Sequence, residues 1–285
     1  MEKEFEQALN SLLNFDPAGV SDPAASYNAL FKQMISSSMQ ICNSTDYAAL
    51  VNQKIEAAEK KYGVKVEISE DAGEDPYKKL REVVRFELAR ESLLANMDYE
   101  VCCTESNLAN AMGKIRGELD KIVPESQKEV VDSMGYALYS DFTKYFVCSV
   151  FDMIADAKIY QMKEFRPLQL NAMGKEVRTN VNVIHQQNGK PQKSETVTNW
   201  FSLMMVLPSF LFKKLYGVSL TEMFEVPQKL KDDSAHMFNI FQRTNESFVA
   251  GDEYKILLHF LAEMGLSECF TVRPKVKKAE KPVVN

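Results

Sequence analysis

Two shortages in the sequence exclude whole classes of function. Only three histidines occur among its 285 residues, and neither an HExxH nor an HxxxH pair is present. Glycine is also scarce, at 11 residues, where an average protein has about 7%. No GxxxxGKS/T loop and no GxGxxG turn occurs, although both use glycine to bring backbone amides close to a phosphate. We therefore predict no metal site, no cofactor and no phosphate-binding loop.

A recognisable catalytic constellation is missing as well. No GxSxG sequence is present. His236 follows Asp232 by one helical turn, and His259 precedes Glu263 by one turn. Such pairs could orient a catalytic imidazole, but they are also common ion pairs on exposed helix faces. We predict a protein that is not an enzyme. The alternative is an enzyme whose site is assembled from residues distant in sequence.

Disulfides, a leader and a membrane span are not indicated. The five cysteines are odd in number and irregularly spaced, which fits neither a disulfide framework nor a CxxC zinc site. Residues 1–7 are acidic and lack the basic start and apolar run of a signal peptide. The one membrane-like stretch, residues 200–212, is shorter than the about 18 residues that a span needs. We expect a cytoplasmic protein, or one inside a particle assembled in the cytoplasm, with no membrane span.

Apolar residues recur at helical spacing through most of the chain. Phe5, Leu9 and Leu12 show this spacing in the first segment. Residues 136–162 form the most apolar long segment, and a helix that is apolar on most sides is usually buried at the centre of a bundle. The predicted fold class is mainly α: an irregular multi-helix bundle with one long inserted β-hairpin and a flexible basic C-terminal tail.

The chain is predicted to have three parts. Residues 1–165 would form a helical body around the central helix 136–162. Residues 166–272 would contribute the hairpin (176–198) and the C-terminal helices, packed on the same core. Residues 273–285 are rich in proline and lysine and would be a flexible tail.

The hairpin is predicted from alternating residues. Residues 177–183 (VRTNVNV) alternate with period two, an Asn-Gly pair follows at 188–189, and residues 194–198 (SETVT) alternate again. Asn-Gly between two alternating runs is a strong hairpin signal. An isolated two-stranded hairpin is only marginally stable in water. The predicted hairpin must therefore lie on its own helical body or grip another subunit.

Charge is unevenly distributed along the chain. The formal net charge is −6. Residues 158–193 contain seven bases and two acids, and residues 273–285 contain five bases and one acid, so the remainder is strongly acidic. We expect the two basic features to meet an acidic surface, which another copy of the chain would supply. The interaction residues predicted on the hairpin and the tail are Arg178, Asn180, Asn182, His185, Lys190, Lys193, Arg273, Lys275, Lys277 and Lys278.

These features favour a non-enzymatic structural or assembly protein. It would bind copies of itself or a larger protein complex through the hairpin arm and the basic tail, and a viral or phage particle is one setting for such a subunit. The alternative partner is nucleic acid, contacted by the 158–193 segment and the tail. The tail, however, lacks the aromatic residues on which bases stack. A protein partner is therefore the favoured hypothesis.

Overall fold

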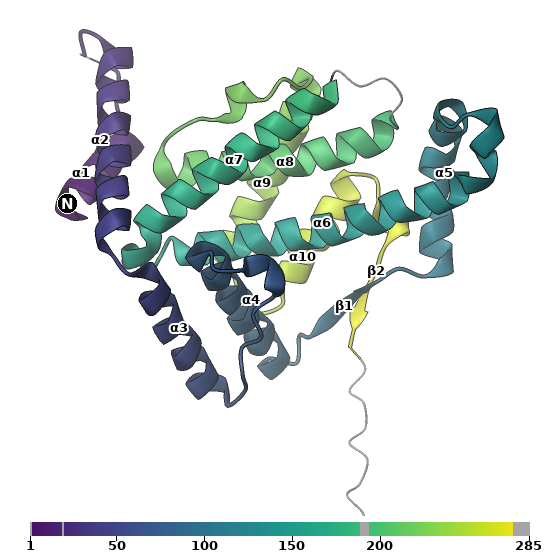
Figure 1. Cartoon of the computed structure of the whole chain (residues 1–285), viewed down its shortest axis with the longest axis horizontal. Coiled ribbons are helices and arrows are strands. Elements are labelled where there is room, and N and C mark those ends of the chain that lie inside the picture. The colour runs from purple at the N-terminus through teal and green to yellow at the C-terminus, as the bar shows by residue number, and fades with distance from the viewer. Residues whose placement is uncertain (1, 19, 189–193, 276–285) are drawn as a thin grey trace, which may run out of the picture.

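The computed structural model describes residues 2–18, 20–188 and 194–275, and within them the protein is mainly helical, as predicted (Figure 1). The helices are α1 (Glu2–Leu13), α2 (Pro23–Ser44), α3 (Tyr47–Tyr62), α4 (Pro76–Leu94), α5 (Glu105–Ile122), α6 (Val131–Ile159), α7 (Arg166–Asn188), α8 (Glu195–Tyr216), α9 (Gln228–Glu246) and α10 (Asp252–Glu263). Two short strands, β1 (Tyr99–Cys102) and β2 (Thr271–Pro274), form an antiparallel pair.

Side-chain caps fix where several helices begin. The Asp22 carboxylate accepts a hydrogen bond from the amide of Ala25, and Pro23 occupies the first turn of α2, where its missing N–H costs nothing. Thr104 and Asn107 form a reciprocal capping box at the start of α5. These residues satisfy amides that a helix start leaves without partners, so the boundaries follow from local chemistry.

The longest helix, α6, runs through the middle of the molecule (Figure 1). Helices α4, α5, α8 and α10 all pack against it. Helix α1 packs on α2, and α2 in turn packs on α7, which pairs with α8. Helix α7 thus lies between α2 and α8, and α1 also contacts α8 directly.

Aromatic rings from α6 and α8 form the centre of the core. The ring centroids of Phe142 and Phe146 are 5.7 Å apart, and those of Phe142 and Trp200 are 5.4 Å apart. Full burial of each large apolar side chain contributes about 1.5–3 kcal/mol relative to exposure. The same cluster of buried residues includes Phe5 in α1 and Phe270 just before β2. One apolar core therefore joins the first helix to the last strand.

The predicted hairpin at 176–198 is wrong. Residues up to 188 continue α7, and residues from 195 onward form α8. Residues 189–193, which include the glycine of the predicted turn, lie outside the described residues. The alternating valines had a second interpretation, because Val177 and Val181 are four residues apart. With Leu170, Met173 and Ile184 they form a stripe at helical spacing, and that stripe faces the interior.

The two strands come from distant parts of the chain. Val101 is paired with Val272, and Glu100 is paired with Arg273. The predicted free tail therefore begins too early, because Arg273 is part of β2 and the Lys275 amide donates a hydrogen bond to the Asp98 carbonyl at 3.0 Å. Residues 276–285 lie outside the described residues.

The membrane-like stretch 200–212 lies inside α8. Trp200, Leu207 and Leu211 are buried in the core. Among the helices of the described residues, none combines the length and the apolar composition that crossing a bilayer requires.

Candidate functional site

Helix α7 carries the residues from which the site is built, and it presents three different faces. Gln169 and Glu176 face a polar network with α4 and α6. Val177 and Ile184 are buried against α8. Lys175 and Arg178 lie on a third face, beside α2.

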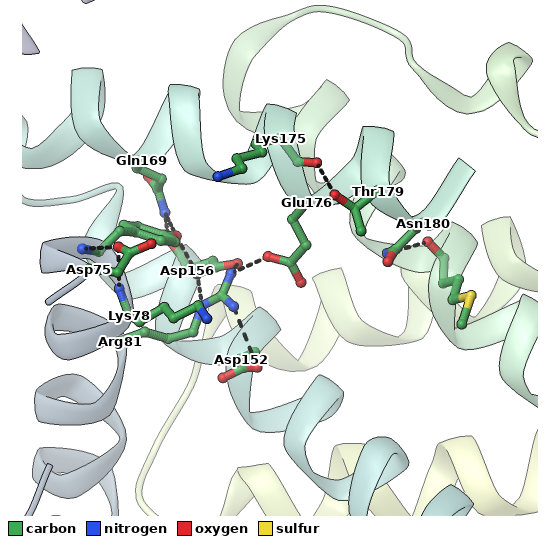
Figure 2. Close-up of polar contacts among 12 residues, drawn as sticks. Asp75, Lys78, Arg81, Asp152, Asp156, Gln169, Lys175, Glu176, Thr179 and Asn180 are labelled. Atoms are coloured by element: carbon green, nitrogen blue, oxygen red, sulfur yellow. Dashed lines mark hydrogen bonds and ion pairs between the residues drawn. The ribbon is translucent and has the colours of Figure 1, made fainter. Parts of the chain in front are cut away.

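The network on the first face centres on Arg81 of α4 (Figure 2). Its Nε and Nη2 atoms donate to the two carboxylate oxygens of Asp156, both at 2.9 Å. Nη2 also donates to Oε2 of Glu176 at 2.8 Å, and Nη1 lies 3.5 Å from Oδ2 of Asp152. One guanidinium thus joins α4, α6 and α7 through charge-assisted hydrogen bonds.

Asp156 is the buried member of this network. The Tyr77 hydroxyl donates to its carboxylate at 2.5 Å, and Gln169 Nε2 donates to its backbone carbonyl at 2.7 Å. Burial raises the pKa of Asp156 to about 6, because loss of water outweighs the attraction of Arg81. Because this network joins α4, α6 and α7, we interpret it as a structural link between helices.

On the second face of α7, Asn180 forms a hydrogen bond within the protein. Its Nδ2 donates to the carbonyl of Met205 in α8 at 3.1 Å (Figure 2). The side chain lies among the contacts between α7 and α8, where Val177, Ile184 and Val206 are buried. Asn180 was predicted as a contact for a partner, and in the structure its side chain links α7 to α8 through this hydrogen bond.

The third face of α7 forms, with α2 and the end of α8, an apolar groove of about 710 Å³. We call it the α2–α7 groove. Residues 31, 35 and 39 lie on one side of α2 because they are spaced four apart. Its apolar lining, which we call the floor, includes Phe31, Ile35, Leu170, Phe212 and Leu220. Cys42, Asn43, Asn171 and Gly174 also line the groove. The rim consists of Met39, Lys175, Arg178 and Met223.

The rim combines exposed methionines with unpaired bases. Met39 is 55% exposed and Met223 is 45% exposed, which is unusual for large apolar side chains. Lys175 and Arg178 are also exposed, and neither forms an ion pair with a residue that the structure describes. Of the residues that the structure describes, no Asp or Glu lines the groove. The groove is therefore an apolar surface with a positive edge.

The remaining predicted interaction residues do not gather with Arg178. Asn182 is exposed on α7, and His185 Nδ1 lies 2.9 Å from Oε2 of Glu225. In the strand pair, Arg273 Nε donates to Glu100 at 2.8 Å.

Among the other predicted tail and hairpin bases, Lys275 Nζ lies 2.9 Å from Asp98. Lys190, Lys193, Lys277 and Lys278 lie outside the described residues. Both described bases of the predicted tail, Arg273 and Lys275, thus pair with acids on or beside β1.

The two methionines and Lys175 of the groove were not singled out from the sequence. One signal did exist on α2, where Phe31, Ile35 and Met39 form a second apolar stripe beside the fully buried Met34. A helix with two such stripes has more apolar surface than one core contact needs. Lys175 had no comparable signal, because its position at the rim depends on how α7 packs against α2.

Two further observations bear on function. Within the part of the chain that the structure describes, no three His, Cys, Asp or Glu side chains are grouped so as to hold a metal ion. Comparisons with protein-family models, with curated proteins and with solved structures find no match for the chain.

Proposed function

We propose that this protein is a protein-binding subunit of a larger assembly, and that the α2–α7 groove receives an amphipathic, acidic helix of the partner protein. The observation that carries the proposal is the groove itself, with its apolar floor, its exposed methionines and its two unpaired bases. In this proposal, the contact with the partner is made by the groove, and not by the hairpin arm that was expected from the sequence.

The apolar part of the groove favours a helical partner. Exposed apolar patches on a folded protein are typical of interaction sites. Methionine is unbranched and polarisable, so the exposed side chains of Met39 and Met223 can adapt to an incoming apolar surface. A helix lying in a groove offers side chains at i, i+4 and i+7, which can contact a floor built from residues of α2, α7 and α8.

The charged part of the groove favours an acidic partner. Lys175 and Arg178 are three residues apart on α7, so both project from the same side of the helix. Arginine forms two parallel hydrogen bonds with a carboxylate. These bases stand out in a chain of net charge −6, and they would steer an acidic segment toward the groove.

Two other bases of the 158–193 segment are engaged within the chain, which favours a protein partner over nucleic acid. Lys158 lies 4.7 Å from the ring centroid of Phe248, and Arg166 Nη1 lies 2.8 Å from Oε2 of Glu6. A path for phosphates needs several free bases along one surface. Among the bases of this segment that the structure describes, Lys175 and Arg178 are the two that line the groove.

The first test is fluorescence polarisation with a labelled helical probe peptide that carries leucines at i, i+4 and i+7 and glutamates on the flanking positions. Arg178→Glu should raise the Kd of the probe about tenfold, which corresponds to about 1.4 kcal/mol. Lys144→Glu is the matched control, because Lys144 is exposed within α6 and lies outside the groove. Equal loss of affinity in both variants would contradict the proposed site.

A second pair of variants tests the apolar floor. A Cβ added at Gly174 would meet the Phe212 ring at an ordinary 3.7 Å, so Gly174→Leu fills the groove without a clash at its base. Gly117→Leu makes the same change in α5, where a Cβ has nothing within 4 Å. We expect weaker probe binding only in Gly174→Leu. Unchanged binding in Gly174→Leu would show that the probe does not bind in the groove. The same measurement with a labelled DNA probe tests the alternative partner, and tighter binding of DNA than of the peptide would favour nucleic acid.

A further inference from the structure

A second cavity lies between α8, α9 and α10 and is independent of the α2–α7 groove. Its volume of about 580 Å³ falls within the range of sites for small ligands, roughly 300–1,000 Å³. Trp200 and Leu203 of α8, Leu230 and Met237 of α9 and Met264 after α10 supply its apolar lining. We call it the three-helix cleft.

The polar lining of this cleft contains more acidic than basic residues. Glu195 of α8, Asp233 of α9 and Glu263 of α10 contribute three carboxylates, against one lysine, Lys229. The carboxylates come from three helices, so the acidic lining arises from the packing and does not reflect a local run of acids.

His236 also lines the cleft. Glu263 Oε2 lies 3.3 Å from His236 Nε2, which ties α10 to α9 at the edge of the cleft. Asp233 forms no ion pair or hydrogen bond with the residues that the structure describes. Its carboxylate is therefore available to a ligand.

We propose that the three-helix cleft binds an organic cation, an ammonium or guanidinium group attached to an apolar chain. The carboxylates of Asp233, Glu195 and Glu263 would neutralise the charge. The apolar side chains would cover the stem, as they do for the methylene groups of lysine and arginine elsewhere in proteins. The Trp200 indole adds a ring face or edge to the same lining.

Two sources share this chemistry. A free polyamine carries ammonium groups on apolar stems, and so does a lysine or, with a guanidinium, an arginine of a peptide. Both fit a cleft whose lining contains more acids than bases. This proposed cation site is formed by α8, α9 and α10, and it does not depend on the α2–α7 groove.

The chain reports on the cleft through its own fluorescence, because Trp200 is its only tryptophan. The purified protein is titrated with spermidine and, separately, with a short arginine-containing peptide. The citrulline form of that peptide is the control without charge. Isothermal calorimetry on the same samples detects binding that leaves the emission of Trp200 unchanged. A saturable signal with spermidine alone assigns the site to a free polyamine, and one with the arginine peptide alone assigns it to a basic side chain.

Two neighbouring aspartates give a matched pair of variants. Asp233→Asn removes a carboxylate from the cleft, whereas Asp232→Asn removes the same charge from an exposed residue that does not line it. We expect Asp233→Asn to raise the Kd of the bound cation about five- to tenfold, or roughly 1.0–1.4 kcal/mol, and Asp232→Asn to change it less than about twofold. The proposal is overturned if neither cation binds below about 10 mM, or if both variants lose affinity equally.

Discussion

At the scale of single residues, the most consequential position is Asp156, a carboxylate buried among helices. Arg81 and Tyr77 both donate hydrogen bonds to it, and loss of water nevertheless raises its pKa from 3.8 to about 6. Removing one partner of a buried charged pair leaves the other without compensation, which is why such networks resist substitution. The titration of Asp156 therefore contributes to how the stability of the protein responds to pH.

The sign of that response follows from the direction of the shift. Between about pH 4 and pH 6 the unfolded chain releases the Asp156 proton while the folded chain keeps it, so the free energy of unfolding falls as pH rises. Asp156→Asn removes this contribution. We expect the stability of wild type relative to Asp156→Asn to fall by about 1–3 kcal/mol over this window, given 1.36 kcal/mol per pKa unit.

Urea denaturation at intervals between pH 4 and pH 7 measures the effect. Asp132→Asn is the control, because Asp132 belongs to the same helix and is exposed. A pH dependence that is identical in wild type and Asp156→Asn would show that Asp156 does not titrate in this range.

At the scale of elements, α7 shows how an alternating sequence can still fold as a helix. Its valines satisfy period two, but they satisfy a period near 3.6 as well once Leu170, Met173 and Ile184 are included. Packing against α8 stabilises α7 as a helix, because it buries Ile184. An isolated two-stranded hairpin would have no surface against which to bury that side chain. Tertiary packing overrides the local β preference of Val and Thr.

Two adjacent residues test this helical face directly. Ile184 is fully buried and Val183 is only partly buried. Ile184→Ala should therefore lower the free energy of unfolding by about 2–5 kcal/mol, the usual range for a buried large-to-Ala change. Val183→Ala should cost clearly less. The reverse order in chemical denaturation would mean that Val183, and not Ile184, faces the core.

At the scale of the whole molecule, a main core spans nearly the entire chain. Its buried residues run from Phe5 in α1 to Phe270. The paired strands β1 and β2 are also far apart in the sequence. Residues on both sides of 166 belong to this one cluster of buried residues. A smaller cluster, including Val177 and Phe224, lies between α7, α8 and the segment that follows.

A continuous core predicts cooperative unfolding. Trp200 lies beside Phe142 at the centre, so its fluorescence reports on packing, while far-ultraviolet circular dichroism reports on helix content. We expect the two signals to change together in a single transition with urea. Separate midpoints would show that part of the helical body unfolds independently of the core around α6.

The sequence by itself determined the features that depend only on residues close together in the chain. The helical class, the caps at Asp22 and Thr104 and the left-handed Gly63 that ends α3 (φ 67°) all follow from spacing and local hydrogen bonding. Only the tertiary structure decided the rest. The state of α7, the pairing of β1 with β2 and the gathering of Met39 with Arg178 depend on contacts between residues far apart in the chain. No periodicity within one segment can specify which distant surface will cover it.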